Sequence, residues 1–146
     1  MVDNKGYLKI VDMGTAKVLK REDGMKTFTV LGTPHYMAPE ILANKGYGLN
    51  ADLWSIGIIL YEFMCGFVPF GEECEDPYEV YTMVQTQKLA YPPYFQQPAN
   101  KHAQKFMEQL LSRNPEARKN GSNFASLKAN KWFDLFDWVI FFLILG

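Results

Sequence analysis

One long apolar segment, Asn50 to Gly66, constrains the fold more than any other part of the sequence. It reads NADLWSIGIILYEFMCG, and its apolar residues fall on every side of a helical wheel. A helix of this kind is normally buried, and at 1.5 Å per residue its length of roughly 25 Å spans a small domain but not a bilayer. The segment therefore predicts a central core helix, capped at its start by Asn50 and ended by Gly66.

Asp52 lies in the first turn of this expected helix. A carboxylate is favourable there because the unpaired backbone N–H groups and the positive end of the helix dipole are close to it. We expect this aspartate to be buried, and two interpretations stay open. The carboxylate either stabilises the end of the helix or binds backbone donors of another segment and fastens that segment to the helix.

The composition is that of a globular domain. The chain has 146 residues, of which 48% are apolar and 21% charged, with a net charge of −1, and is long enough to bury a core. No basic stripe is present, so we expect neither nucleic acid nor a membrane as a partner. Cys65 and Cys74 form no CxxC pair, which favours reduced thiols and a cytoplasmic protein. His35 and His102 have no companions at metal-ligand spacing, so neither is predicted to bind a metal.

Three short motifs follow one another along the chain. Asp12-Met13-Gly14 comes after a short expected strand, Gly32-Thr33-Pro34 leads into Ala38-Pro39-Glu40, and Asp52-Leu53-Trp54 opens the apolar helix. A carboxylate beside a glycine at a strand end suits a metal ion, although the first motif alone also fits a simple turn. Together the motifs resemble the C-terminal lobe of eukaryotic protein kinases, with Asp12 at the Asp-Phe-Gly position and Glu40 at the Ala-Pro-Glu position.

The resemblance implies a mostly α fold, namely the C-lobe part of a protein kinase domain. Asp3-Asn4-Lys5-Gly6 is a turn sequence, so a short β-hairpin remnant is expected at the N-terminus. We predict a kinase domain part over residues 1–133 and a divergent hydrophobic tail over residues 134–146. The N-lobe, the glycine-rich loop and the His-Arg-Asp stretch of the family would lie upstream of Met1, so the chain is expected to be N-terminally truncated.

The resemblance also assigns roles around the phosphate-transfer site. Asp12 is implied to hold the Mg²⁺ that accompanies ATP, and Thr33 to contact the family's catalytic Asp and Lys. Thr29 matches the phosphorylated threonine of the activation loop, and Lys17 is a cation that can pair with that phosphate and order the loop. The alternative is that Thr29 is an unmodified loop threonine. Met13 stands where the family has Phe, a tolerable change for an apolar packing residue.

The resemblance also implies a substrate-binding residue and an ion pair that supports the substrate-binding segment. By family position, Glu62 resembles the glutamate that receives a substrate arginine, which predicts protein or peptide substrates with basic residues. Arg118 matches the arginine that pairs with the Ala-Pro-Glu glutamate, here Glu40, in a buried bidentate pair that braces the substrate-binding segment. The acidic loop of residues 72–76, which reads EECED, adds to the attraction for such substrates or is simply solvated, and we favour the solvated loop.

The subgroup is indicated by shorter runs. Residues 29–34, 66–70 and 131–133 look like the AGC group, while residues 14–17 and 61–66 look most like cGMP-dependent protein kinases of protists.

The hypothesis from the sequence is a fragment of a serine/threonine kinase that transfers the ATP gamma-phosphate to proteins and is inactive as this chain alone. The alternatives are a non-catalytic substrate-docking or regulatory binding module, and a gene-model fragment with no separate existence. Without the rest of the kinase domain, part of the core helix is expected to be bare.

The segment from Trp138 to Leu145 departs from the family, whose chain turns polar here. Its eight apolar residues are too few to span a bilayer. They plug a groove, anchor weakly at a membrane or reflect a misread exon boundary, and we favour the last explanation.

Overall fold

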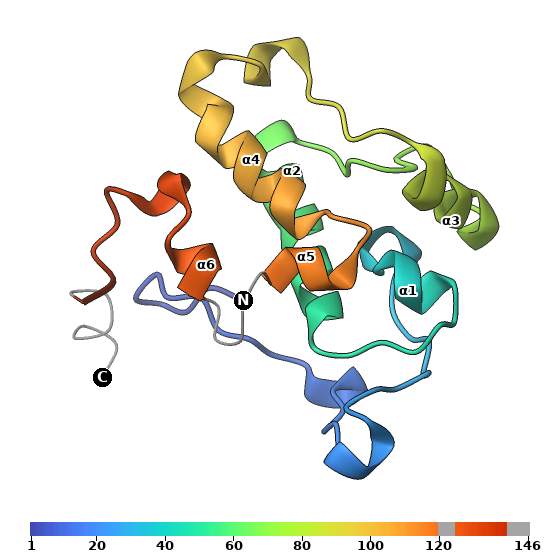
Figure 1. The fold of residues 1–146 in the computed structure, drawn as a ribbon. Helices are drawn as coiled ribbons and strands as arrows, with labels where there is room; N and C mark the ends of the chain where they lie inside the picture. The colour runs from blue at the N-terminus through green and yellow to red at the C-terminus, as the bar shows by residue number, and fades with distance from the viewer. Residues whose placement is uncertain (120–124, 140–146) are drawn as a thin grey trace.

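The computed structural model describes residues 1–119 and 125–139 and is mostly helical (Figure 1). Its α-helices are α1 (Pro39–Leu42), α2 (Asn50–Cys65), α3 (Pro77–Thr86), α4 (Lys101–Leu110), α5 (Pro115–Lys119) and α6 (Ala125–Lys128). Short 3-10 turns are η1 (Met13–Thr15), η2 (Arg21–Asp23), η3 (Pro34–Tyr36), η4 (Pro93–Phe95), η5 (Pro98–Asn100) and η6 (Lys131–Phe133). Within the described ranges, β-pairing is limited to isolated bridges. The predicted fold class is thereby confirmed.

Helix α2 is the expected central helix, and its two ends differ from each other. At the C-terminal end Gly66 has a φ of 87°, and its N–H donates to Glu62 O at 2.7 Å, so the glycine ends the helix as predicted. At the other end the prediction of an Asn50 cap is wrong. Leu49 already has helical backbone angles and occupies the N-cap position, while the Asn50 amide donates to Glu116 Oε1 at 3.4 Å.

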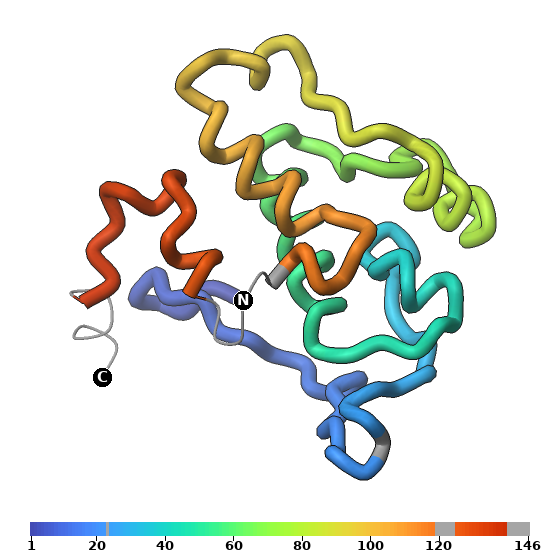
Figure 2. Tube along the Cα trace, viewed as in Figure 1, coloured from blue at the N-terminus to red at the C-terminus, as the bar shows by residue number. Residues whose placement is uncertain are grey.

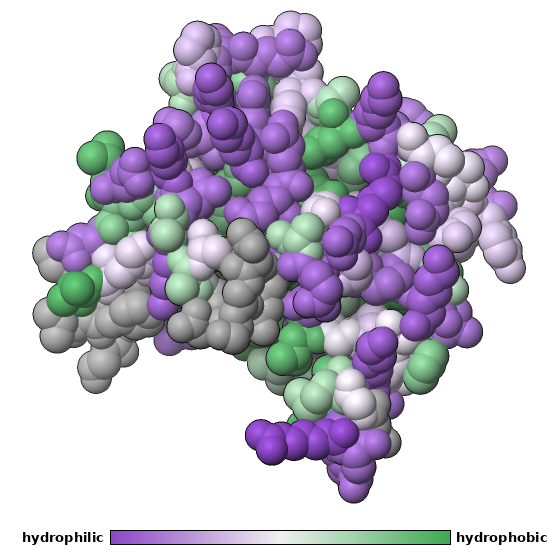
Figure 3. Space-filling model, in the orientation of Figure 1, coloured by the Kyte–Doolittle hydropathy of each residue, from purple (hydrophilic) through white to green (hydrophobic). Residues whose placement is uncertain are grey.

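The core is built around α2, which packs against α4, α5 and η3 (Figure 1). Trp54, Ile58 and Tyr61 on α2 are essentially inaccessible to solvent. Gly57 allows α2 and α4 to approach closely, because a Cβ atom there would lie 2.9 Å from Leu110 Cβ. Hydrophilic side chains cover much of the molecular face drawn in Figure 3, and hydrophobic ones appear there in small separate areas.

One side of α2 is not covered by the described residues. Ile56, Ile59 and Phe63, which recur at helical spacing, are 50%, 40% and 78% exposed. The expectation that the whole helix is buried is therefore wrong for this side, and the expectation of a partly bare helix holds there. The other sides are buried because α4, α5 and η3 pack on them.

The N-terminal residues form the expected hairpin remnant. Val2 and Leu8 make an antiparallel bridge, and the Asp3 carboxylate accepts hydrogen bonds from the backbone N–H groups of Lys5 and Tyr7 at 2.9 Å. Leu8 and Ile10 remain exposed. Figure 2 traces this segment along one edge of the helical body, ahead of η1.

The C-terminal part of the described chain is an aromatic cluster. Phe106 of α4 packs edge-on against Phe133, with ring centroids 5.1 Å apart, and Trp132 and Trp138 extend the cluster. Much of the predicted apolar tail, residues 140–146, lies outside the described residues. None of the described helices combines the length and the apolar character needed to cross a membrane.

Candidate functional site

A buried ion pair joins α1 to α5. Glu40 lies in the first turn of α1 and Arg118 near the end of α5; the arginine side chain is fully buried and the glutamate side chain 11% exposed. The guanidinium donates Nη1 to Glu40 Oε1 at 2.7 Å and Nη2 to Glu40 Oε2 at 2.8 Å, which is a bidentate geometry. This is the arrangement expected from the resemblance, and its bracing role stays a prediction.

Two further N–H donors of Arg118 are also used. Its Nε donates to Ser112 O at 2.7 Å, and Nη1 donates to Asn50 O at 3.2 Å, at the first residue of α2. The guanidinium carbon lies 5.1 Å from the ring centroid of Trp54. A buried charge is tolerated only when it is paired and hydrogen-bonded. Because Arg118 meets these conditions, it ties α1, α2 and the segment before α5 together.

Asp12 occupies an unusual backbone position at the start of η1. Its φ of 62° and ψ of 71° are left-handed, and its Oδ1 accepts the backbone N–H of Gly14 at 3.3 Å. The carboxylate is exposed and faces a cavity of about 570 Å³, which is also lined by Lys17, Thr33 and Asp52. Thr29 lines it as well, so the structure brings together five of the predicted site residues around one cavity.

The fit of Asp12 to magnesium is partial. A Mg²⁺ ion takes six oxygen ligands and usually keeps several waters, with one or two carboxylates from the protein. Asp12 is an exposed carboxylate that can supply one of these. Among residues 1–119 and 125–139, no group of three or more His, Cys, Asp or Glu side chains is close enough together to hold a metal ion.

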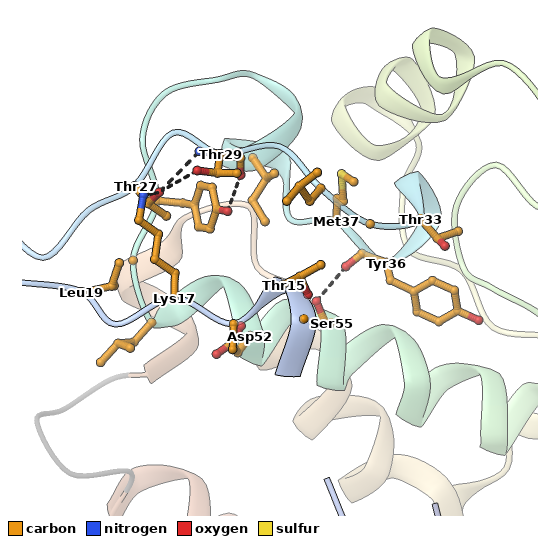
Figure 4. Close-up of a pocket in the computed structure, with 18 of the residues that line it drawn as sticks. Thr15, Lys17, Leu19, Thr27, Thr29, Thr33, Tyr36, Met37, Asp52 and Ser55 are labelled. Atoms are coloured by element: carbon orange, nitrogen blue, oxygen red, sulfur yellow. Dashed lines mark hydrogen bonds between the residues drawn. The ribbon is translucent and has the colours of Figure 1, made fainter. Parts of the chain in front are cut away.

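Lys17 is linked to Thr29 through Thr27, a residue that the sequence did not predict. Its Nζ donates to Thr27 Oγ1 at 2.8 Å, and Thr27 Oγ1 lies 3.3 Å from Thr29 Oγ1 (Figure 4). Thr27 is buried, whereas Thr29 is exposed. The predicted pair of Lys17 and Thr29 is therefore linked through the Thr27 hydroxyl, and Thr29 is the threonine that is open to solvent.

Tyr47 is a second residue that the sequence reasoning missed. Its backbone forms an antiparallel bridge with Thr27, with both N···O distances at 2.9 Å, and its hydroxyl donates to Thr29 O. The neighbouring Gly46 has a φ of 73°, and a Cβ there would lie 2.8 Å from the Phe28 ring. These contacts hold the Thr27–Thr29 backbone against the segment that leads into α2.

Glu62 lies on α2 and is half-buried. Its Oε2 accepts a hydrogen bond from the Tyr36 hydroxyl at 2.8 Å, while Ser55 Oγ donates to Tyr36 O at 2.8 Å. The bond to Glu62 and, to a smaller extent, burial raise the pKa of the Tyr36 hydroxyl. Tyr36 thus connects η3 to α2 at the carboxylate that is predicted to receive a substrate arginine.

The two other predicted positions have no side-chain hydrogen bond to the described part of the chain. Thr33 is exposed and lies at the N-cap of η3 without a capping bond. Asp52 is also exposed, so the expectation that it is buried is wrong, because its side chain lies on the wall of the open cavity (Figure 4). Of the two interpretations for Asp52, the fastening of another segment has no partner among the described residues.

Comparison with known proteins identifies the family. The sequence matches the protein kinase domain over residues 1–133. It is 41% identical over 140 residues to a cGMP-dependent protein kinase of Toxoplasma gondii, covering 94% of this chain and 13% of that protein. A cGMP-dependent protein kinase of Plasmodium berghei is 39% identical, with 94% of this chain and 16% of the relative covered.

A cAMP-dependent protein kinase catalytic subunit of Dictyostelium discoideum is 33% identical over 138 residues, which cover 94% of this chain and 20% of that protein. The chain thus spans between 13% and 20% of the length of these relatives. The predicted resemblance to cGMP-dependent kinases of protists is confirmed, and the chain belongs to the protein kinase family.

Proposed function

We propose that this chain is the substrate-side part of a serine/threonine protein kinase that transfers the ATP gamma-phosphate to proteins. The observation that carries the proposal is the cavity onto which Asp12, Lys17 and Thr33 open together. In phosphoryl transfer a protein mainly positions the reactants and stabilises charge. A metal-binding carboxylate beside the activation segment is one component of such a site.

Asp12 is the residue that would hold Mg²⁺ of Mg-ATP, and its exposed carboxylate is compatible with that role. The metal would neutralise the charge of the phosphates. Thr33 would contact the family's catalytic Asp and Lys, which this sequence does not contain at matching positions. For this reason we propose that the 146 residues alone do not transfer phosphate and need the N-lobe as a partner.

Thr29 is the proposed site of activating phosphorylation. Thr29 is exposed, and the Thr27 hydroxyl group lies between it and Lys17, within hydrogen-bond distance of both side chains. A phosphate on Thr29 would carry close to two negative charges. The Lys17 side chain could rotate so that its ammonium group pairs with this phosphate. The backbone contacts of Tyr47 would keep the acceptor in place while it is modified.

Glu62 is proposed to receive a basic residue of the substrate. A half-buried carboxylate binds a guanidinium more strongly than an exposed one, because solvent screens it less. The Tyr36 hydroxyl occupies Oε2 and leaves Oε1 without a hydrogen-bond partner in the described chain.

Residues 1–133 are the proposed kinase domain part, and residues 134–146 are the proposed divergent tail. The proposed location of the protein is the cytoplasm.

A chimera tests the catalytic proposal. The upstream kinase-domain residues of the Toxoplasma gondii relative would be joined to this chain, and phosphorylation of an arginine-containing peptide measured with Mg-ATP. We expect activity in the chimera and a loss of about 100-fold or more in Asp12→Asn, since the metal ligand is removed. An active chimera that is indifferent to Asp12→Asn would contradict the proposed role.

The second candidate function is a non-catalytic module that docks kinase substrates or competes with a complete kinase. It is favoured by one observation, namely that Glu62 and its Tyr36 partner are both formed within this chain. A pull-down with basic peptides, repeated with Glu62→Ala, tests it. Binding that is absent or independent of Glu62 would count against this function.

A further inference from the structure

A groove lies at the start of α3, away from the cavity that contains Asp12. It has a volume of about 450 Å³ and is lined by Cys74, Tyr78, Glu79, Thr82 and Met83. Two of its walls are large apolar side chains that solvent reaches freely, since Tyr78 is 81% and Met83 39% exposed. Such a groove has the size to take one or two apolar side chains of another molecule.

The surroundings of this groove are strongly acidic. Between Lys45 and Lys88 the sequence has seven Asp and Glu residues and no Lys or Arg, although the whole chain contains 15 Lys and Arg. Glu73, Glu75 and Glu79 are exposed, and within the described ranges none of them forms an ion pair. Glu79 in the wall of the groove, and Glu73 and Glu75 on either side of Cys74 in the sequence, therefore form an acidic rim that no ion pair of the described residues neutralises.

The groove is built on a firmly held scaffold. The opposite side of α3 is buried in the core through Val80 and Val84, and Arg113 Nε donates to Val84 O at 2.7 Å. Asp76 caps the helix by accepting the Tyr78 N–H at 2.8 Å. His35 Nε2 lies 2.9 Å from Gly71 O and ties the preceding loop to η3. A partner would therefore meet a surface that is already formed.

We infer that this groove docks a protein segment in which an apolar side chain is flanked by lysines or arginines. The apolar side chain fills the space between Tyr78 and Met83, and the flanking cations lie against Glu73, Glu75 and Glu79. Anionic partners, including acidic peptides, are repelled by the same rim. The site differs from the one proposed at Glu62 on α2, and the inference goes beyond the proposed function because it needs no phosphate transfer.

Alkylation of Cys74 provides a local readout. Cys65 is buried at 4% exposure, whereas Cys74 is partly exposed and lines the groove, so N-ethylmaleimide modification at the two sites is separable by peptide mapping. The probe is the peptide acetyl-Arg-Lys-Leu-Phe-Lys-Arg-amide, added to the full chain. We expect it to bind, and to slow alkylation of Cys74 by about fivefold or more at saturation, because the bound side chain covers the thiol.

Two kinds of variant separate charge from shape. Glu75→Lys combined with Glu79→Lys should weaken peptide binding by about fivefold to tenfold, since two surface attractions become repulsions. Thr82→Trp should block binding by filling the groove, with the charge unchanged. Glu108→Lys on α4, also exposed, is the matched control and should leave binding unchanged.

Several results would overturn the inference. A peptide with Leu-Phe replaced by Ser-Ser should bind much more weakly and fail to protect Cys74; equal protection would mean that charge alone is recognised. A peptide that keeps Leu-Phe but has glutamates on both sides should not protect Cys74. Equal protection by it would contradict the proposed attraction between the acidic rim and flanking cations. Protection that rises with protein concentration without peptide would assign the groove to a second copy of the chain. Loss of Cys74 protection in Glu62→Gln would assign the binding to Glu62, whereas retained protection leaves the two proposals separate.

Discussion

The Glu40–Arg118 pair and the Asp12–Asp52 cavity are two carboxylate-containing regions with opposite environments. Glu40 is almost fully buried and receives two hydrogen bonds from Arg118. Asp12 and Asp52 are exposed, and the only hydrogen bond that the described residues give to either carboxylate is the local one from Gly14 to Asp12. The first region is completed by this chain, while the second has charges that the described residues leave available.

This difference shows that a carboxylate can either stabilise the fold or remain available for binding, depending on its burial. A buried carboxylate without its cation is costly, so loss of Arg118 alone is expected to destabilise the fold. An exposed carboxylate costs little and is free to bind a metal ion or another polypeptide segment. The Glu62–Tyr36 pair is intermediate, being half-buried with one partner inside the chain.

The largest expected effect comes from removing the buried cation. Arg118→Met should lower the free energy of unfolding by about 3–5 kcal/mol, because it leaves the Glu40 carboxylate buried and unpaired. Urea unfolding followed by circular dichroism measures the change. Arg21→Met, at an exposed position, is the matched control. A loss below about 1 kcal/mol for Arg118→Met would mean that the pair does not stabilise the α1–α5 junction.

A smaller effect is expected at the half-buried pair. Tyr36→Phe removes the hydrogen bond to Glu62 and should lower the free energy of unfolding by about 1.5–3 kcal/mol, the range for a hydrogen bond to a charged group. Unfolding of the variant near neutral pH measures it. Tyr78→Phe is the control, since that exposed tyrosine has no hydroxyl bond within residues 1–119 and 125–139. Equal losses in the two variants would contradict the importance of the Glu62 bond.

The same pair predicts a pH dependence. The pKa of Tyr36 is raised in the folded protein by the bond to Glu62, and its ordinary value is about 10. Its contribution to stability should be complete below that ordinary pKa and be lost as the pH rises through the raised pKa. The stability difference between the wild type and Tyr36→Phe should therefore be constant from neutral pH to about pH 9 and shrink above pH 10. A difference that grows with pH would contradict the assigned direction.

The smallest effects are expected at the open cavity. Asp12→Asn and Asp52→Asn should each change the free energy of unfolding by no more than about 0.5 kcal/mol, since both carboxylates are exposed. Parallel urea titrations with the Arg118→Met variant provide the comparison. A loss of about 2 kcal/mol or more at either aspartate would show that the cavity is braced as tightly as the buried pair.

Much of the fold follows from the sequence because its strongest signals are local. The apolar pattern of residues 50–66 and the glycine at its end locate α2 to within one residue. The Asn50 cap was predicted wrongly because Leu49 adopts helical angles, which only the tertiary setting of the preceding loop decides. The bare side of α2 also escapes a wheel diagram, which cannot tell which side of a helix will find neighbours.

The candidate site also contains residues that the sequence predicts and residues that only the structure reveals. Asp12, Thr33, Glu62 and the Glu40–Arg118 pair were located through motif resemblance, and their roles stay predictions. Thr27, Tyr36 and Tyr47 were missed because each acts through a contact between segments that are distant in sequence. One sequence signal could have pointed to Thr27: residues two apart in an extended segment lie on the same face, so Thr27 is expected beside Thr29.

Phosphate transfer by the purified 146-residue chain is the measurement that decides whether these residues are catalytically complete. The chain would be incubated with radiolabelled Mg-ATP and an arginine-containing peptide, beside its Asp12→Asn variant. We expect no transfer above the level of the variant, because Asp12 and the other proposed site residues of this chain would supply only part of a catalytic site. Robust transfer that depends on Mg²⁺ and is lost in Asp12→Asn would contradict it.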